Sequence, residues 1–189
     1  SYVYDIGPYS VLIARMDDGG VRAFLNVCTH RGTRLIAAEG CAYTPSFTCP
    51  FHGWSWNLDG SVRNIPGQWD FPHAADDSHR LAEVRCETWG GFIFINLNPE
   101  TAPLDDYLGV IKGHFAPFPL ERRRIRAHVQ KTLPANWKLA QEAFMEAFHV
   151  VATHPQLLAG IGDAISQYDV FGNFSRAITP NGTPSPHLS

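Results

Sequence analysis

Long apolar runs, an excess of basic residues and an abundance of cysteine are all missing from this chain of 189 residues. No apolar stretch approaches the roughly 18 residues that a membrane-spanning helix requires, so no membrane partner is expected. Lysine and arginine total 15 against 18 aspartate and glutamate, and a net charge of −3 gives no support for binding to nucleic acid. Four cysteines are too few for the disulfide framework of a small secreted domain. We therefore expect a cytoplasmic protein in a reducing compartment.

Hydrophobic residues are plentiful, at 44% of the chain, and can form a buried core. Up to position 100, β-prone runs alternate with turn residues, which predicts a small antiparallel β domain over residues 1–100. Asp59 and Gly60 mark a hairpin turn between Trp56 and Val62, because glycine readily adopts positive φ. The expected strands are Tyr9 to Arg15, Val21 to Asn26, Ser55 to Asn57, Leu81 to Thr88 and Gly91 to Asn96.

Prolines bracket a linker over residues 101–127, which is predicted to contain one short helix from Asp105 to His114. The remaining segment, 128–189, is predicted to combine helix and strand, so the chain as a whole falls in the α+β class. A strand is expected over 128–133, and one or two more from Gln167 to Thr179. Three apolar residues of this region could line a substrate cavity or pack in the core: Phe171, Phe174 and Ile178.

A helix is predicted between these strands, from about Trp137 to Val151. Leu139, Phe144 and Phe148 recur at spacings of three to five, and no glycine or proline interrupts the segment until Pro155.

Two short motifs each offer one thiolate and one imidazole, namely Cys28 with His30 and Cys49 with His52. A structural zinc accepts the same atoms, but its usual patterns keep the two cysteines together and the two histidines together. A [2Fe–2S] cluster of the Rieske kind needs two cysteines on one iron and two histidines on the other. Two loops that each supply one cysteine and one histidine suit such a cluster, because each loop then spans both irons.

The surrounding residues resemble the Rieske domain of the oxygenase components of ring-hydroxylating oxygenases. The likeness rests on Cys28-Thr29-His30-Arg31-Gly32 and on Cys49-Pro50-Phe51-His52-Gly53-Trp54. It implies that residues 1–100 are a Rieske [2Fe-2S] domain. Rieske proteins of respiratory complexes carry a further cysteine in each loop, whereas Arg31 and Gly53 follow the histidines here. The remaining cysteines, Cys41 and Cys86, are expected to be small buried residues.

Glu146, His149 and His154 form a second candidate metal site. Five residues apart on an unbroken helix, the two histidines would lie roughly 140° apart, so the helix must end or bulge between them. Pro155 disfavours helical geometry at His154 and places it just past the helix end. Glu146 lies on the helical face of His149 and can reach a group near the metal. Two histidines and one carboxylate form the facial triad of non-haem Fe(II) oxygenases.

This stretch resembles the mononuclear iron motif of the same oxygenase family, Asp/Glu-x-x-His-x-x-x-x-His. The resemblance implies that His149 and His154 bind iron, and that Glu146 bridges this site to a Rieske histidine of the neighbouring subunit. The third ligand of the family is an aspartate far downstream. Asp163 and Asp169 lie too close to the histidine pair to match it, and each is expected to be a solvated or capping residue. We therefore expect the third ligand to lie outside this chain.

The resemblance implies a large (alpha) terminal oxygenase subunit that is truncated at both ends. Residues 128–189 would be the first part of a helix-grip-like α+β catalytic domain. Electrons would pass from NAD(P)H through a separate reductase, with or without a ferredoxin, to the Rieske cluster and then to mononuclear Fe(II). The expected assembly is a homotrimer or an α3β3 complex.

Dioxygenation of an aromatic substrate is the first expectation, and monooxygenation or demethylation of a smaller or quaternary-amine substrate is the alternative. Two other classes of protein also remain. A non-catalytic Rieske electron-transfer protein would explain the β domain but not the segment from Glu146 to His154. A regulatory module without catalysis would require His149 and His154 to bind zinc.

Overall fold

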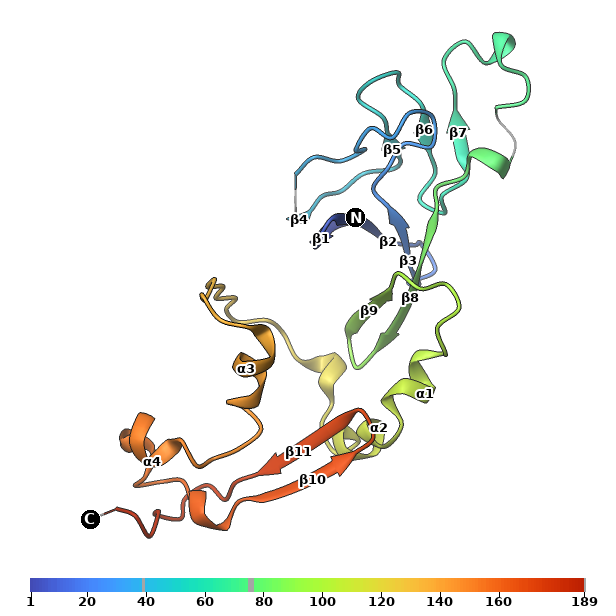
Figure 1. The fold of residues 1–189 in the computed structure, drawn as a ribbon. Helices are drawn as coiled ribbons and strands as arrows, with labels where there is room; N and C mark the ends of the chain where they lie inside the picture. Colours follow the sequence, from blue (N-terminus) through green and yellow to red (C-terminus); the bar gives the residue numbers. More distant parts are fainter. Residues whose placement is uncertain (39, 75–76, 189) are drawn as a thin grey trace. The chain divides into compact units, whose positions relative to one another are not determined.

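The computed structural model describes residues 1–38, 40–74 and 77–188. An antiparallel β region is followed by short helices and a further β-hairpin, which confirms the predicted α+β class (Figure 1). Within the described ranges, every helix is too short or too polar to traverse a lipid bilayer.

The chain divides into two compact units. The first comprises Ser1–Asp106 and Phe118–Arg123, and the second comprises Tyr107–Pro117 and the chain from Arg124 onward. The domain boundaries predicted near positions 100 and 127 stay predictions.

A six-stranded antiparallel sheet in the order β4-β1-β2-β3-β8-β9 forms the base of the first unit. Gly7, with φ 54°, closes the tight hairpin between β1 and β2, in which Ile6 pairs with Tyr9. Cys86 is partly buried against the sheet, whereas Cys41 is exposed because β4 is an edge strand, which corrects the expectation that it is buried. The strands are β1 (Tyr2–Ile6), β2 (Tyr9–Arg15), β3 (Val21–Leu25), β4 (Gly40–Cys41), β8 (Glu83–Trp89) and β9 (Phe92–Asn96).

Strand β2 is buried on both of its faces. Leu12 and Ala14 belong to one core, and Val11 and Ile13 belong to another, as the two-residue period of a strand requires. The core that contains Leu12 also contains the cysteines of both motifs and most of the buried aromatic side chains. Its further members include Phe24, Cys28, Leu35, Phe47, Cys49, Trp54, Trp56, Ile65 and Leu81.

A second, three-stranded antiparallel sheet consists of β5 (Phe47–Thr48), β6 (Ser55–Trp56) and β7 (Val62–Asn64). The hairpin turn predicted at Asp59 and Gly60 is confirmed, since Trp56 pairs with Val62 and Gly60 has φ 81°. The strands predicted from sequence in the first unit all occur, with ends that differ by at most two residues.

The helix predicted from Asp105 to His114 is two helices, α1 (Leu104–Leu108) and α2 (Val110–Phe115). Gly109 separates them with φ 44° and ψ −116°, a conformation that residues with a side chain rarely adopt. The strand predicted over 128–133 is wrong, because no strand of the described chain pairs with these residues. Short 3₁₀ turns lie at Gln68–Asp70, Asp77–His79, Leu120–Arg122, Pro155–Leu157 and Asp163–Ile165.

The long helix predicted over residues 137–151 is also wrong, because two short helices occupy this region, α3 (Trp137–Glu142) and α4 (Val150–Thr153). Phe144 and Phe148 of the predicted apolar stripe are 86% and 84% exposed. Without burial of an apolar face, a helix of this length gains little stability from packing.

The hairpin of β10 (Gln167–Phe171) and β11 (Phe174–Ile178) confirms the strands predicted near the end of the chain. The ring of Phe171 packs edge-on against His114, with centroids 4.9 Å apart, and the ring of Phe174 packs against Tyr107 at 5.1 Å. Both aromatic residues therefore serve as packing contacts within the second unit.

Candidate metal centres

The first cysteine-histidine motif lies in the loop that follows β3. Its turn is closed by two backbone hydrogen bonds: the N–H of Cys28 donates to the carbonyl of Thr33 at 2.8 Å, and the N–H of Gly32 donates to the carbonyl of Cys28 at 2.9 Å. Gly32 has φ 78°, in the left-handed region that favours glycine. Cys28 and His30 are thus carried on one tight turn.

The second motif lies in the loop between β5 and β6 and repeats the same turn. The N–H of Cys49 donates to the carbonyl of Trp54 at 2.7 Å, and the N–H of Gly53 donates to the carbonyl of Cys49 at 3.0 Å. Gly53 has φ 73°. The two turns therefore match in structure, although the cysteine and histidine are separated by one residue in the first and by two in the second.

The two thiols meet at the buried end of these turns. Cys28 and Cys49 are each 2% exposed, and the two thiols lie close enough for each to shift the pKa of the other. Burial is the largest influence on both, and it raises the pKa of the Cys28 thiol. At Cys49, burial also acts to raise the pKa, but the backbone N–H groups of His52 and Phe51 outweigh it, and the pKa is lowered. Such N–H donors favour the thiolate, which is the form that binds metal.

The two imidazoles meet at the exposed end. The rings of His30 and His52 have centroids 4.9 Å apart. His30 also stacks on the indole of Trp54, with centroids 4.7 Å apart and planes 6° from parallel. Partial removal from water, followed by the nearby charge of His52, lowers the pKa of His30. A lowered pKa keeps the ring neutral, as a metal ligand must be.

A third segment links the surroundings of both turns. The carbonyl of His79 accepts one hydrogen bond from the hydroxyl of Thr29 and another from the indole Nε1 of Trp56, both at 2.9 Å. Thr29 lies in the first turn and Trp56 in the strand that follows the second. This contact could not be predicted from the sequence, because Thr29 and His79 are 50 residues apart and no local pattern indicates that they meet.

The pairwise geometry fits a two-iron cluster. Each iron of a Rieske cluster takes only two ligands from the protein, a cysteine pair at one iron and a histidine pair at the other. Here the two buried sulfurs form one pair, and the two exposed imidazoles form the other. In the described ranges, no group of three or more His, Cys, Asp and Glu side chains is placed to hold a single metal ion, as a four-ligand zinc site would require.

The second histidine pair flanks α4. His149 is the residue before the helix and His154 the residue after it, and their ring centroids are 5.3 Å apart. His154 has φ −127° and ψ 50°, so the prediction that it lies just past a helix end is confirmed. The intervening helical turn brings both imidazoles to one side, where they can share an ion.

Glu146 bonds to His149 twice. One carboxylate oxygen pairs with Nδ1 of His149, and the other accepts the backbone N–H of His149 at 3.1 Å. The bond with the His149 side chain is the main reason why the pKa of Glu146 is lowered. A carboxylate on Nδ1 leaves Nε2 of the same ring for a metal and fixes the orientation of the ring.

Tyr168 explains why the helix is interrupted before His149. Its hydroxyl accepts the backbone N–H of Ala147 at 2.8 Å. Because the N–H of Ala147 bonds to Tyr168 and the N–H of His149 bonds to Glu146, neither is available for a helical bond to the carbonyl four residues earlier. Tyr168 was not predicted to have this role, since its partner lies 21 residues away on another element.

Of the two aspartates after His154, Asp163 has surroundings other than those predicted, whereas the side chain of Asp169 is 39% exposed, as expected for a solvated residue. Asp163 is only 9% exposed, and in the described chain its Oδ1 has no hydrogen-bond partner, so it is neither solvated nor a cap. Asp169 forms an ion pair with Arg176 across the β10–β11 hairpin, with Nε of Arg176 at 2.8 Å. Neither joins His149 in a group of three metal-binding side chains within the described residues.

Known families match both regions that contain a candidate centre. The Rieske [2Fe-2S] domain family matches residues 2–75, and the catalytic domain family of ring-hydroxylating alpha subunits matches residues 118–182.

Individual relatives agree with these families. The glycine betaine monooxygenase oxygenase subunit of Chromohalobacter salexigens is 33% identical over 87% of this chain and 36% of its own length. The biphenyl 2,3-dioxygenase subunit alpha of Rhodococcus jostii is 33% identical over 85% of this chain and 36% of its own. A crystal structure of a quaternary ammonium Rieske monooxygenase in complex with L-carnitine superimposes with a TM-score of 0.82 and 25% identity, over 94% of this chain and 51% of that one.

The chain thus spans 36% of the length of the first two relatives. The family combines a Rieske [2Fe-2S] cluster with mononuclear iron and typically receives electrons from NAD(P)H through a reductase, which agrees with the predicted cofactors. The chain belongs to the alpha subunits of the Rieske non-haem iron oxygenases.

Proposed function

We propose that the two twin turns bind a [2Fe–2S] cluster through Cys28, His30, Cys49 and His52. The observation that carries this proposal is the meeting of two buried thiols and, separately, of two imidazoles with ring centroids 4.9 Å apart. Backbone N–H groups directed at the sulfurs stabilise the thiolates, and the stack on Trp54 orients the ring of His30. Such outer contacts tune the redox potential of a metal centre.

The second histidine pair is proposed to bind the mononuclear iron. His149 and His154 supply two ligands, and Glu146 fixes the ring of His149 through Nδ1. The third ligand is proposed to come from outside this chain. When bound, the two metal groups supply electron transfer and the activation of dioxygen, and the protein contributes ligands, hydrogen bonds and orientation.

Glu146 is proposed to be the link between the two kinds of centre. It stands at the carboxylate position of the family motif, and it is bound to the side chain of His149. In a homotrimer or an α3β3 assembly, this carboxylate would meet a Rieske histidine of the neighbouring subunit. A reductase, with or without a ferredoxin, would donate the electrons.

The proposed activity is the oxygenation of a small organic compound, with two candidate substrate classes. Dihydroxylation of an aromatic ring, the first expectation from sequence, is supported by relatives such as the biphenyl dioxygenase subunit. Monooxygenation of a quaternary ammonium compound is supported by the glycine betaine and carnitine enzymes and by glutamate, rather than aspartate, at position 146.

The test uses the full-length oxygenase with NADH and a compatible reductase. Oxygen uptake and product formation are measured against a panel of aromatic compounds, carnitine and glycine betaine, after iron and acid-labile sulfide have been quantified. A cis-diol assigns the first class, and an aldehyde with a released amine assigns the second. Reduction of the cluster without product from any member of the panel, in protein with full mononuclear iron, would instead favour an electron-transfer protein.

A further inference from the structure

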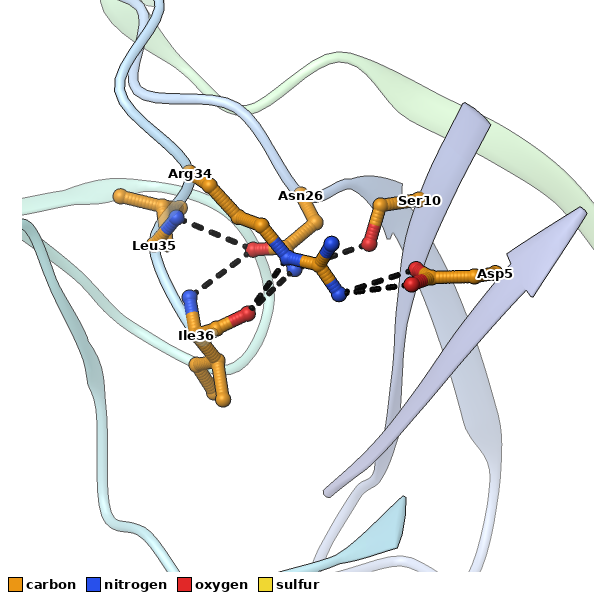
Figure 2. A network of polar contacts seen from close by, with 6 residues as sticks. All are labelled: Asp5, Ser10, Asn26, Arg34, Leu35 and Ile36. Carbon is orange, nitrogen blue, oxygen red and sulfur yellow. Dashed lines mark hydrogen bonds and ion pairs between the residues drawn. The ribbon is translucent and has the colours of Figure 1, made fainter. Parts of the chain in front are cut away.

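Asn26 is a polar side chain in the core of the first unit, only 1% exposed, and all of its hydrogen-bonding capacity is used (Figure 2). Its Nδ2 donates to the hydroxyl of Ser10 at 3.0 Å and to the carbonyl of Ile36 at 2.8 Å. Its Oδ1 accepts the backbone N–H groups of Leu35 at 3.1 Å and Ile36 at 3.0 Å. Two donors and two acceptors are thus satisfied by three residues that lie 9 to 16 positions away.

These contacts join the two ends of the first cysteine-histidine turn. Asn26 lies two residues before Cys28, and its own N–H donates to the carbonyl of Ser10 in β2 at 2.9 Å. Leu35 and Ile36 lie just after the residues that close the turn. One amide therefore attaches the strand entering the turn, the chain leaving it and the neighbouring strand to one another.

A second contact extends this attachment toward the surface (Figure 2). Nε of Arg34 donates to the same carbonyl of Ile36 at 3.0 Å, and its guanidinium binds both oxygens of Asp5 in β1, at 2.9 and 3.0 Å. Arg34 and Asp5 are partly exposed, so this ion pair adds little to stability. The buried amide is the part of the network that water cannot replace.

Only an amide satisfies all of these groups. A carboxylate keeps the acceptor for Leu35 and Ile36, but it loses both donors and places a negative charge beside the carbonyl of Ile36. An apolar side chain leaves two backbone N–H groups without a partner in the core, and the carbonyl of Ile36 keeps only its bond from Arg34. In either case the ends of the turn are free to shift, and Cys28 and His30 shift with them.

We propose that Asn26 is a positioning residue for the [2Fe–2S] cluster, which it acts on through the backbone that carries Cys28 and His30. This inference rests on the proposed function, because it requires that the two turns bind the cluster. If Asn26 has this role, its substitution changes the rate of cluster loss and the EPR g-values of the cluster, in addition to any change in the stability of the fold.

The experiment uses the full-length, cluster-containing oxygenase and compares wild type with Asn26→Asp and with Leu12→Ala. Leu12 lies in the same core and is fully buried, but its side chain has no hydrogen-bonding atom. Its substitution therefore lowers stability without altering the polar attachment of the turn. The measurements are the rate at which a chelator bleaches the cluster, under conditions where each protein is equally folded, and the EPR g-values of the reduced cluster.

We expect Asn26→Asp to lose its cluster about 10- to 100-fold faster than wild type, with shifted g-values, since outer partners typically have effects of this size. Leu12→Ala should match wild type in both readouts. Ser10→Ala, which removes one of the four bonds, serves if Asn26→Asp does not fold, and it should show a smaller shift in the same direction. Wild-type bleaching rates and g-values in both polar variants would overturn the positioning role while leaving the cluster assignment intact. A wild-type protein that binds zinc in place of the cluster would overturn both.

Discussion

Single residues keep the histidines of the two candidate centres in place by different means. In the first unit, the flat indole of Trp54 lies against the ring of His30, and no hydrogen bond to that ring is needed. In the second unit, the carboxylate of Glu146 binds Nδ1 of His149. A stacked ring resists tilting, whereas a bonded Nδ1 also fixes the tautomer and raises the basicity of the other nitrogen.

Replacing Glu146 with glutamine should reduce oxygenase turnover by about 10- to 100-fold, while both metal centres remain occupied. Glutamine keeps one acceptor oxygen, but its amide nitrogen cannot accept, so either the bond to Nδ1 or the bond to the N–H of His149 is lost. Turnover, iron content and the Rieske EPR signal of the full-length enzyme are the measurements. Glu142→Gln, in the exposed part of α3, is the control and should behave as wild type. Normal turnover with full iron in the Glu146 variant would exclude the proposed link.

Asp59 makes the stability of the first unit depend on pH. The hydroxyl and the N–H of Ser61 both donate to its carboxylate, at 2.6 and 2.9 Å, and they lower the pKa of Asp59. Because the pKa of Asp59 is lower in the folded state than in the unfolded state, its carboxylate stabilises the fold fully at pH values above the unfolded-state pKa. This stabilisation is lost as the pH falls through the lowered folded value.

Asp59→Asn should therefore cost about 1 kcal/mol at neutral pH and flatten the loss of stability that the wild type shows as the pH falls below about 4. Urea unfolding at several pH values measures both effects. Asp17→Asn, on the exposed turn after β2, should leave the acid profile unchanged. An acid profile in Asp59→Asn that matches wild type would contradict the role given to Ser61.

Among the elements, most of the predicted strands occur, whereas the strand expected over 128–133 and the two uninterrupted helices do not. Strands β2, β3, β8 and β9 could be predicted because β-branched and aromatic residues are grouped between turn residues, and the hairpin turn at Gly60 has a local signal. The interruption between α3 and α4 depends on Tyr168, which lies on β10, so no window of sequence contains both partners. The candidate ligands of both centres were predicted from their motifs and remain predictions, whereas Asn26 was missed because its partners come from β2 and from the far end of the turn.

The hairpin between β6 and β7 offers a direct test of close packing. A Cβ at Gly60 would lie 2.5 Å from the ring of Phe24, and the substituted residue would have to adopt a φ of 81°. Gly60→Ala should therefore destabilise the first unit by roughly 2–4 kcal/mol, of which about 1–2 kcal/mol is backbone strain. Gly7→Ala is the matched control, since it has φ 54° but no described atom within 4 Å of the added Cβ. Equal losses of stability in the two variants, measured by thermal or urea unfolding, would show that Phe24 moves aside at no cost in free energy.

At the scale of the molecule, the two candidate centres belong to different compact units. The cysteine-histidine turns lie in the first unit, and the segment from Glu146 to His154 lies in the second. Each centre has its own small set of supporting contacts within its unit. Loss of one should therefore leave the other able to bind metal.

Cys28→Ser and His154→Ala should separate the two centres in the full-length enzyme. Cys28→Ser should abolish the Rieske EPR signal and turnover while mononuclear iron is retained. His154→Ala should keep that EPR signal but lose mononuclear iron and reduce turnover by roughly 100-fold or more, since a ligand matters at least as much as its outer partners. His187→Ala, exposed near the end of the chain, is the control. Loss of the EPR signal in His154→Ala would show that the centres do not bind metal independently.

The twin turns also determine which positions can be varied by protein engineers. Each turn is closed by main-chain atoms and a glycine, so the side chains of Arg31 and Phe51 contribute nothing to its closure. Both side chains are exposed, and they contact each other, with the guanidinium carbon of Arg31 5.9 Å from the ring centroid of Phe51. Libraries restricted to this pair would sample charge and polarity beside the proposed cluster while the two turns stay unchanged, which offers a way to adjust the midpoint potential of that cluster without redesigning the domain.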